Sequence, residues 1–500
     1  MTSEHFDVLI VGAGISGIGA AYHLGANCPG KTYAILEGRE AIGGTWDLFR
    51  YPGIRSDSDM YTLGYSFKPW TQAKAIADGP AILDYLHETA RENDIERHIR
   101  FRHMVKRASW SSETASWTVD IETGADKTIV QYTCNFLFMC SGYYSYKGGY
   151  TPEFPGADKF QGRIVHPQKW TSDIDYKDKR VIVIGSGATA VTLVPEMAKE
   201  AAHVTMLQRS PTYVVSRPAE DALANKLRAW LPAKLAYGLT RWKNVLFGMY
   251  FFRMARNKPQ QVKEYILNMV KEQLGEEYVA KHFTPTYNPW DQRLCLVPDS
   301  DLFEAIKTDR ADVVTDHIET FTADGIKLKS GTELKADLIV TATGLNMEML
   351  SGLEITVDGK PVTVGKTFNY KGMMFSGVPN LASSFGYTNA SWTLKCDLTC
   401  AYVCRLINHM DKTGTRQATP VLKYPNMESE PWFDFSSGYV QRALGKLPLQ
   451  GTEAPWKVYQ NYALDLVALK FGKVEDGVMQ FTNKASDQKA ATPAKQQAAA

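Results

Sequence analysis

The sequence lacks a large excess of charge of either sign, a CxxC cysteine pair and a segment that we predict to span a membrane. Lys plus Arg number 56 against 54 Asp plus Glu, so the net charge of +2 gives no overall field to recruit nucleic acid. The seven cysteines form no CxxC pair, and no secretory signal is recognised, so we expect free thiols and a cytoplasmic location. With 44% hydrophobic residues over 500 positions, the composition excludes disorder, collagen and small disulfide scaffolds.

One uncharged stretch does occur, from Val8 to Ala26. It contains five glycines and His23, and Glu4 and Asp7 precede it where a signal peptide would carry cationic residues. The stretch also divides at Gly12 into an aliphatic half and a helical half. We therefore interpret it as a strand followed by a glycine turn and a helix.

Two such strand–helix–strand units occur in the chain. The expected strands and helices are Asp7–Val11, Ile15–Leu24 and Tyr33–Leu36, then Val181–Ile184, Val191–Lys199 and His203–Leu207. A further strand is expected at Asp337–Val340, ahead of an Ala-Thr-Gly turn that ends at Gly344. The predicted fold class is α/β, with two interleaved Rossmann-like dinucleotide-binding domains and a helical insertion.

The first unit carries the spacing of a dinucleotide-binding turn. Gly12, Gly14 and Gly17 follow its first strand, which permits a tight turn, close approach of a pyrophosphate and close helix packing. Glu37 ends the second strand, where a carboxylate can accept hydrogen bonds from ribose hydroxyls. This site therefore favours a cofactor with a free 2′-hydroxyl, such as FAD.

The second unit has Gly185, Gly187 and Ala190 at the equivalent positions, but its second strand ends without an acid. Arg209 stands there instead, followed by Ser210, and a guanidinium can hold a 2′-phosphate with two hydrogen bonds. The second site therefore favours NADP(H), and we expect NADPH to reduce the flavin.

The cysteine pattern bears on which group accepts electrons from the reduced flavin. Cys134 and Cys140 lie in an apolar run expected to be a buried strand, and Cys396, Cys400 and Cys404 recur along a helix without a fourth ligand. We therefore expect no redox cysteine pair and no metal site. Molecular oxygen is the expected electron acceptor.

The expected domain boundaries follow from these motifs. The FAD-binding domain is predicted at 1–150 and 344–484, and the NADP-binding domain at 151–343 with a helical insertion at about 219–282. Within the insertion, basic residues flank the apolar run Val245–Phe252, which is too short to span a bilayer. We favour a cap on the second domain, with contact to a membrane surface as the minor alternative. A disordered tail is expected at 485–500.

Two longer strings resemble a known family. Gly43-Gly44-Thr45-Trp46 through Tyr51-Pro52-Gly53 to Asp57 resembles the [A/G]GxWxxxx[F/Y]P[G/M]xxxD fingerprint of Baeyer–Villiger monooxygenases. The string Phe160 to Thr171 resembles the family's FxGxxxHxxxW[P/D], with Thr171 where Pro or Asp is usual. The departure at Thr171 leaves a related nitrogen- or sulfur-oxygenating flavin enzyme open. The resemblance extends to about Phe481 and is greatest to the bacterial ethionamide-activating FAD monooxygenase subgroup.

The resemblance implies roles for individual residues. The family's catalytic arginine and its partner aspartate correspond to Arg293 and Asp57, and His166 lies in an interdomain connection. Contacts to FAD are implied for Gly12, Gly14, Ser16, Gly17, Glu37, Gly44, Thr45, Trp46, Asp47, Leu48, Asp57, Tyr61 and Val105. Contacts to NADP(H) are implied for Arg55, Gly185, Ser186, Gly187, Ala188, Thr189, Ala190, Gln208, Arg209 and Ser210. Residues Asn389–Trp392 are expected near the flavin and the substrate.

The activity implied is an FAD-containing, NADPH-dependent Baeyer–Villiger monooxygenase. Reduced flavin and O2 form a C4a-peroxyflavin that converts ketones to esters, and a permanently charged arginine stabilises the anions that arise. S-oxygenation of thioethers or thioamides is the expected side activity, and a heteroatom oxygenase that makes no esters is the alternative. A non-catalytic flavin sensor is disfavoured because both glycine motifs, Arg293 and Asp57 are present. The chain is expected to be a monomer or a homodimer.

Overall fold

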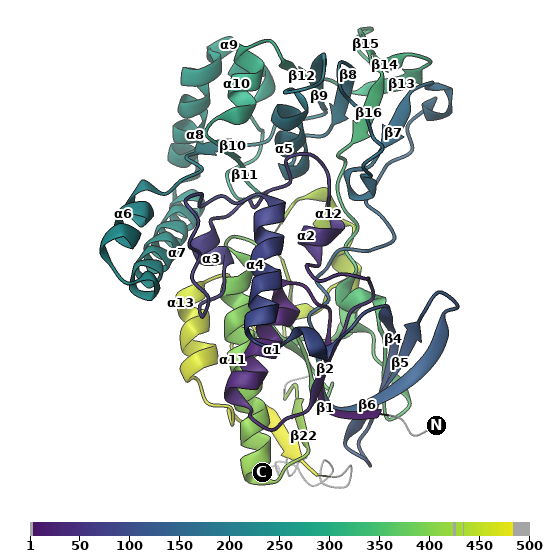
Figure 1. Ribbon diagram of the computed structural model, residues 1–500, viewed down its shortest axis with the longest axis vertical. Helices are drawn as coiled ribbons and strands as arrows, with labels where there is room; N and C mark the ends of the chain where they lie inside the picture. Colours follow the sequence, from purple (N-terminus) through teal and green to yellow (C-terminus); the bar gives the residue numbers. More distant parts are fainter. Residues whose placement is uncertain (1–3, 424–426, 434, 484–500) are drawn as a thin grey trace, which may run out of the picture.

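The computed structural model describes residues 4–423, 427–433 and 435–483, so the tail predicted at 485–500 lies outside the described residues. Figure 1 shows two α/β units, one above the other, with a helical arm on one side. Each unit is built on its own sheet, and the chain passes from the first unit to the second and back again.

The first sheet combines a parallel part with an antiparallel part. Its parallel strands are β1 (Glu4–Val11), β2 (Tyr33–Leu36), β3 (Ile99–Arg100) and β6 (Thr128–Met139). The other edge of β6 pairs with the antiparallel strand β5 (Ser116–Thr123), which in turn pairs with the antiparallel strand β4 (His103–Ser111). Strands β17 (Glu354–Val357) and β21 (Leu381–Ser383) join the sheet after the chain returns from the second unit.

The second half of strand β1, Val8–Val11, is continuously apolar because both of its faces are buried. Val8 and Ile10 pack toward helices α1 (Ile15–Asn27) and α11 (Trp392–Thr413), whereas Leu9 and Val11 pack toward the antiparallel strands. The continuous run of β-branched and aliphatic residues in the sequence is therefore a central strand with a layer on each side.

The second sheet is parallel and has the order β12-β9-β8-β16-β7. Its strands are β7 (Arg163–Val165), β8 (Arg180–Ile184), β9 (His203–Gln208), β12 (Ala311–Thr315) and β16 (Leu338–Thr341). In β8, Val181 and Val183 face helix α5 (Ala188–Met197), while Ile182 packs toward the antiparallel meander of β13 (Ile318–Thr322), β14 (Gly325–Leu328) and β15 (Glu333–Lys335). The predicted fold class is confirmed, and the second unit repeats the layering of the first.

The strand pairing bears on the predicted domain division without testing it. The first sheet takes strands from residues 4–139 and 354–383, and the second sheet takes strands from 163–341. The division into a discontinuous FAD-binding domain and an inserted NADP-binding domain stays a prediction, which this pairing supports.

The helical insertion leaves the second unit after β10 (Val214–Arg217) and returns at β11 (Cys295–Pro298), which pairs with β10. Its helices are α6 (Ala222–Trp230), α7 (Ala233–Asn257), α8 (Pro259–Leu274) and α9 (Glu276–His282), so the expected helix-rich segment is confirmed. The run Val245–Phe252 lies inside α7. Within the described residues, no helix is both long enough and apolar enough to cross a bilayer.

Helix α7 is anchored to the first unit by a buried cation. Arg241 donates hydrogen bonds to the backbone oxygens of Tyr61 and Gly64, both at 2.8 Å, and its other nitrogen lies 3.5 Å from Asp397. Tyr61 belongs to the short helix α3 (Met60–Leu63), and Asp397 to α11. One side of the insertion therefore packs on the first unit, although the insertion belongs in sequence to the second.

Candidate active site

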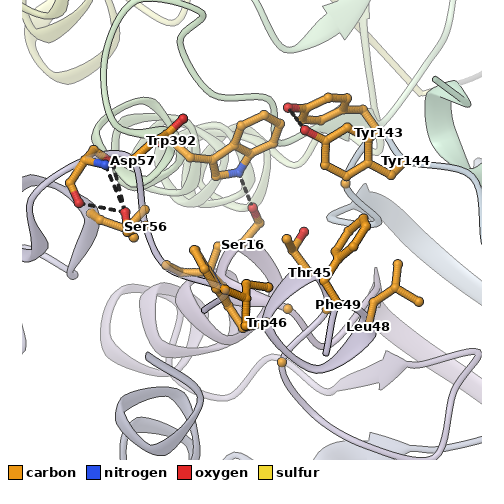
Figure 2. A pocket seen from close by; sticks show the side chains of 18 of the residues that line it. Ser16, Thr45, Trp46, Leu48, Phe49, Ser56, Asp57, Tyr143, Tyr144 and Trp392 are labelled. Carbon is orange, nitrogen blue, oxygen red and sulfur yellow. Dashed lines mark hydrogen bonds between the residues drawn. The ribbon is translucent and has the colours of Figure 1, made fainter. Parts of the chain in front are cut away.

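A cavity lies where the two units meet, and residues from both of them line it. The first unit contributes the turn after β1, much of segment 43–58, segment 140–146 after β6, and Ala390–Trp392 at the start of α11. The second unit contributes Ala188, Thr189 and Thr192 of α5, together with Arg293 and Leu296. Figure 2 labels side chains that the first unit contributes to the wall of this cavity.

The first glycine turn is shaped by close backbone approach. A side chain at Gly12, which has φ +104°, would lie 2.6 Å from the carbonyl oxygen of Cys140, and one at Gly17 would lie 1.8 Å from that of Gly12. Helix α1 starts after Gly14 with no side-chain cap and no acid in its first turn. The free N–H groups at this end face the cavity and suit a pyrophosphate, so the turn fits FAD.

Glu37 directly follows β2 and lies on the cavity wall. Its carboxylate accepts hydrogen bonds from the backbone N–H of Ala13 at 2.8 Å and of Arg39 at 2.9 Å. Burial raises the pKa of this carboxyl, while the two N–H donors oppose that rise. The two bonds hold the carboxylate in place beside the glycine turn, where a ribose would lie.

The second glycine turn has the same form. A side chain at Gly185, at φ +137°, would lie 2.4 Å from the carbonyl oxygen of Ala342, whereas one at Gly187 would meet no heavy atom within 4 Å. Helix α5 starts after Gly187 without a side-chain cap or an acid in its first turn. Ser186 donates a hydrogen bond to the backbone oxygen of Ser210 at 3.1 Å, so the turn and the end of β9 are adjacent.

The last residue of β9 and the two residues that follow it differ in the hydrogen bonds that their side chains form. Arg209 and Ser210 are exposed, and within the described residues the guanidinium of Arg209 has no hydrogen bond or ion pair. The amide nitrogen of Gln208, in contrast, is buried and donates to the backbone oxygen of His282 at 2.7 Å and to Thr315 Oγ1 at 2.9 Å. Gln208 supports the strand end through its side chain, and any contact with NADP(H) would use its backbone.

The structure brings many of the predicted site residues together on the cavity wall. These are Gly12, Gly14, Ser16, Glu37, Gly44, Thr45, Trp46, Leu48, Arg55, Asp57, Ala188, Thr189 and Arg293. The others lie off this wall: Gly17, Asp47, Tyr61, Val105, Gly185, Ser186, Gly187, Ala190, Gln208, Arg209 and Ser210. Asp47, for example, is buried between Arg39 and Arg50, with which it forms ion pairs. The contacts of all these residues with cofactors stay predictions.

Arg293 and Asp57 meet on the cavity wall, with Nε of the arginine 3.0 Å from Oδ2 of the aspartate. Both side chains are about one third exposed, at 36% and 33%. The charge of Asp57 is the main reason that the pKa of Arg293 is raised above its usual value, so the guanidinium stays charged. The pair presents a fixed cation to the cavity.

The loop before β11 positions Arg293. Trp290 adopts φ +71°, an uncommon conformation for a bulky residue, and its ring meets that of Phe252 of α7 edge to face at 5.5 Å. Asp291 accepts a hydrogen bond from the backbone N–H of Asn288 at 3.0 Å and pairs with Arg256 of α7 at 3.2 Å. Helix α7 of the insertion therefore contacts and supports the loop that carries Arg293, the candidate catalytic residue.

Asp57 is carried by a segment that packs against the second unit. Gly53, at φ +74°, lies so close to α5 that a side chain there would be 2.8 Å from Cβ of Glu196. Two residues on, Arg55 forms an ion pair with Asp301 at the start of α10 (Asp301–Lys307). The segment that resembles the first family fingerprint is therefore a contact between the units as well as a wall of the cavity.

The sequence analysis missed an aromatic wall. The hydroxyls of Tyr143 and Tyr144 lie 2.6 Å apart, and the ring of Tyr143 stacks on that of Trp392 at 5.1 Å (Figure 2). Burial raises the pKa of Tyr143 to about 12, so its hydroxyl is protonated at neutral pH. Trp392 donates a hydrogen bond to Oγ of Ser16 at 2.9 Å, which joins the starts of α11 and α1. The position of the two tyrosines, directly after a strand that ends beside β1, is the signal that could have identified them.

His166 connects the two units. Its Nδ1 accepts a hydrogen bond from the backbone N–H of Gln168 at 3.1 Å, so Nε2 carries the proton and donates to the backbone oxygen of Gly344 at 3.0 Å. Burial lowers the pKa of this imidazole. His166 thus ties the end of β7 to the point where the chain returns to the first unit. Thr171 is exposed nearby, and Arg163 pairs with Asp173 at 2.7 Å.

All seven cysteines are free and buried, including Cys134 and Cys140 beside β1 and three on α11. In the part of the chain that the structure describes, no group of three His, Cys, Asp or Glu side chains is arranged to hold a metal ion.

Comparison with family models gives two matches. Residues 75–349 match the flavin-binding monooxygenase-like family, and residues 10–77 match an NAD(P)-binding Rossmann-like domain. The Rossmann-like match covers the glycine turn after β1 and Glu37. The monooxygenase-like match covers the glycine turn after β8, His166 and Arg293.

Comparison with curated proteins gives relatives over nearly the whole chain. FAD-containing monooxygenase EthA of Mycobacterium tuberculosis is 54% identical over 486 residues, which cover 96% of this chain and 99% of that protein. Probable FAD-binding monooxygenase AlmA of Acinetobacter baylyi is 48% identical, with 96% of this chain and 97% of that protein covered.

Solved structures with the same fold are more distant in sequence. An oxidised steroid monooxygenase bound to NADP aligns with a TM-score of 0.76 at 23% identity, covering 96% of this chain and all of that one. A closed cyclohexanone monooxygenase aligns with a TM-score of 0.70 at 21% identity, covering 84% and 87%. The predicted family and fold are confirmed.

Proposed function

This chain belongs to the flavin-binding monooxygenase-like family, and from that membership we propose that it is a Baeyer–Villiger monooxygenase. It is a flavin monooxygenase with FAD and NADP as its cofactors. The proposal adds that NADPH is the reductant, that ketones are converted to esters, and that S-oxygenation of thioethers or thioamides is a side activity. The seven buried free thiols support a reducing compartment, for which we propose the cytoplasm.

The observation that carries the proposal is the Arg293–Asp57 ion pair on the wall of a cavity between two dinucleotide turns. FAD bound here would supply the activated oxygen, and ester formation would place negative charge on the carbonyl oxygen of the ketone. A guanidinium that keeps its proton stabilises this charge without donating the proton outright. Asp57 orients the guanidinium and holds its charge.

Other residues of this chain bind the cofactors. We propose that FAD lies along the wall formed by the first glycine turn, Glu37 and segment 44–48, with its pyrophosphate at the start of α1. NADP(H) is proposed to lie with its pyrophosphate at the start of α5 and its 2′-phosphate at Arg209. These turns lie on the two units that meet at the cavity, as hydride transfer between the cofactors requires.

The aromatic wall supports a second candidate function. Tyr143 and Tyr144 lie beside Arg293 and keep their protons, so they can act as hydrogen-bond donors toward the reacting oxygen. A protonated activated oxygen is electrophilic and reacts with sulfur or nitrogen, whereas a deprotonated one is nucleophilic and reacts with a ketone. A heteroatom oxygenase that forms no ester is therefore the alternative.

The test is product analysis by mass spectrometry. The purified FAD-loaded enzyme is incubated with NADPH, isotopically heavy O2, a linear 2-ketone and an aryl methyl thioether. Ester that carries one heavy oxygen atom would establish the proposal. Labelled sulfoxide without ester from any of a small panel of ketones would favour the alternative, and hydrogen peroxide alone would contradict both assignments for these substrate classes.

A further inference from the structure

The outer side of the insertion exposes a periodic apolar surface. We call it the insertion face, and it consists of Trp230, Leu235, Leu239, Trp242, Leu246 and Tyr250. On α7 these residues are spaced by three or four positions, so they form one stripe about 22 Å long at 1.5 Å per residue. Single exposed apolar residues are ordinary on soluble proteins, but a continuous stripe on one helix face indicates a partner.

The exposure is large and includes aromatic residues. Trp230, at the corner between α6 and α7, is 86% exposed, and Tyr250 is 63% exposed. The opposite side of α7 is buried, because Arg241 and Val245 face the first unit. Helix α7 therefore carries apolar residues on two sides, and only its inner side is covered by other described residues. In Figure 1, α6 and α7 project at the edge of the molecule.

The apolar surface continues on a second element. Leu464, Val467 and Phe471 are 50%, 62% and 69% exposed along α13 (Tyr462–Asp465) and the helical turn η7 (Leu466–Phe471) that follows it. The ring of Tyr462 meets that of Trp242 edge to face at 5.7 Å, so the two stripes adjoin. Segments more than 200 residues apart in the sequence thus form one surface.

The charge of this segment indicates the kind of partner. From Ala222 to Lys258 the chain has eight Lys or Arg residues and no Asp or Glu. The whole chain has 56 basic and 54 acidic residues, so the remainder without these eight is net negative. Within the described residues, Lys226, Lys234, Arg253 and Lys258 form no ion pair. These cations flank the insertion face and are free to meet an anionic partner.

We propose that the insertion face binds the surface of a bilayer that contains anionic lipid. Leu and Trp side chains would enter the boundary between headgroups and acyl chains, Trp230 and Tyr250 would lie at headgroup level, and the free cations would meet lipid phosphates. A second copy of the chain fits this surface less well. A two-fold interface would place the same basic segment on both sides, with like charges opposed.

The surface lies close to the cavity. Val245 and Met249, on the inner side of α7, pack with Tyr387 and Ala390, which line the cavity. A single helix therefore separates the insertion face from the cavity wall. The binding proposed here does not depend on the reaction catalysed, so its test stands apart from that of the proposed function.

The test is sedimentation of the FAD-loaded full chain with vesicles of phosphatidylcholine alone or with phosphatidylglycerol. We expect binding to the anionic vesicles that weakens as salt is raised. Leu239→Glu with Leu246→Glu should weaken binding on the order of 100-fold, since two buried leucine contacts are lost. Leu246→Glu alone is compared with Ile129→Glu, because Ile129 is 54% exposed on the distant strand β6 and should be dispensable.

A second pair of variants tests the charge. Lys226→Gln and Lys234→Gln should each weaken binding to the anionic vesicles about fivefold and leave any binding to phosphatidylcholine unchanged. Flavin absorbance and the unfolding midpoint report that each variant is folded. The proposal is overturned if the wild type does not sediment with anionic vesicles, or if Leu246→Glu and Ile129→Glu bind equally. It is also overturned if the wild type is a dimer that Leu246→Glu dissociates and that binds no vesicle.

Discussion

At the scale of single residues, Arg293 presents one charge to the cavity, fixed by one carboxylate at 3.0 Å. We expect Arg293→Ala to bind FAD and to be reduced by NADPH, because neither glycine turn involves this side chain. Ester formation should fall by at least about 100-fold, since a charge that stabilises a developing anion is lost. Stopped-flow flavin reduction and product analysis measure the two effects separately. Arg293→Lys, which keeps the charge without the planar fork, should be intermediate, and ester formation at the normal rate by Arg293→Ala would refute its role.

Arg209 is a cation without a partner in the described residues, beside the second glycine turn. Arg209→Ala should raise the KM for NADPH by about 10- to 150-fold, because a hydrogen-bonded ion pair contributes about 1.5–3 kcal/mol. The KM for NADH, which has no 2′-phosphate, should change little. Arg180→Ala is a matched control, since Arg180 is exposed at the opposite end of β8. Equal effects of Arg209→Ala on both cofactors would show that this residue does not touch the phosphate.

At the scale of the element, the turn between β8 and α5 contains two glycines with different roles, one in folding and one in cofactor binding. A methyl group at Gly187 meets nothing within 4 Å, so Gly187→Ala should fold normally and still raise the KM for NADPH by about tenfold or more, by occupying the approach of the pyrophosphate. Gly185→Ala should instead lower the free energy of unfolding by about 1–3 kcal/mol, because it combines φ +137° with a 2.4 Å contact. Thermal unfolding and steady-state kinetics on both variants separate the two roles. Equal destabilisation by both would contradict this division.

At the scale of the whole molecule, His166 joins the units as a neutral imidazole whose pKa is lowered by burial. In the unfolded chain a histidine has a pKa of about 6.5, so at and below that pH the unfolded state binds more protons. The contribution of neutral His166 to the free energy of unfolding is therefore complete above about pH 6.5 and is lost as the pH falls. The difference in unfolding free energy between the wild type and His166→Gln should be constant from about pH 7 upward and shrink below about pH 6.

Denaturant unfolding across this pH range measures the effect. The exposed His317→Gln is the control for removal of a histidine side chain that does not join the two units. A constant difference for His166→Gln over the whole range would show that the burial of His166 and the hydrogen bond accepted by its Nδ1 do not disfavour the protonated form.

Much of the fold could be predicted because its signals are local. The strand expected at Tyr33–Leu36 has those bounds in the structure, and the helices expected at 219–282 are present. Gly12 and Gly185 marked the two turns correctly because backbone sterics at a positive φ depend on the residue itself. The continuous apolar run of β1 likewise reports burial on both faces.

The sequence by itself determined two dinucleotide turns, their order and the chemistry at the end of each second strand, since these depend on residues a few positions apart. The contact between Arg293 and Asp57 was implied by the family resemblance, and the tertiary structure shows it. Only the tertiary structure decided that Tyr143 and Tyr144 line the cavity and that the side-chain amide of Gln208 bonds within the second unit. It also decided which side of α7 is left uncovered. The physical reason is that packing between segments 70 to more than 200 residues apart sets these contacts and this exposure, and no local pattern of residues encodes which segments will meet.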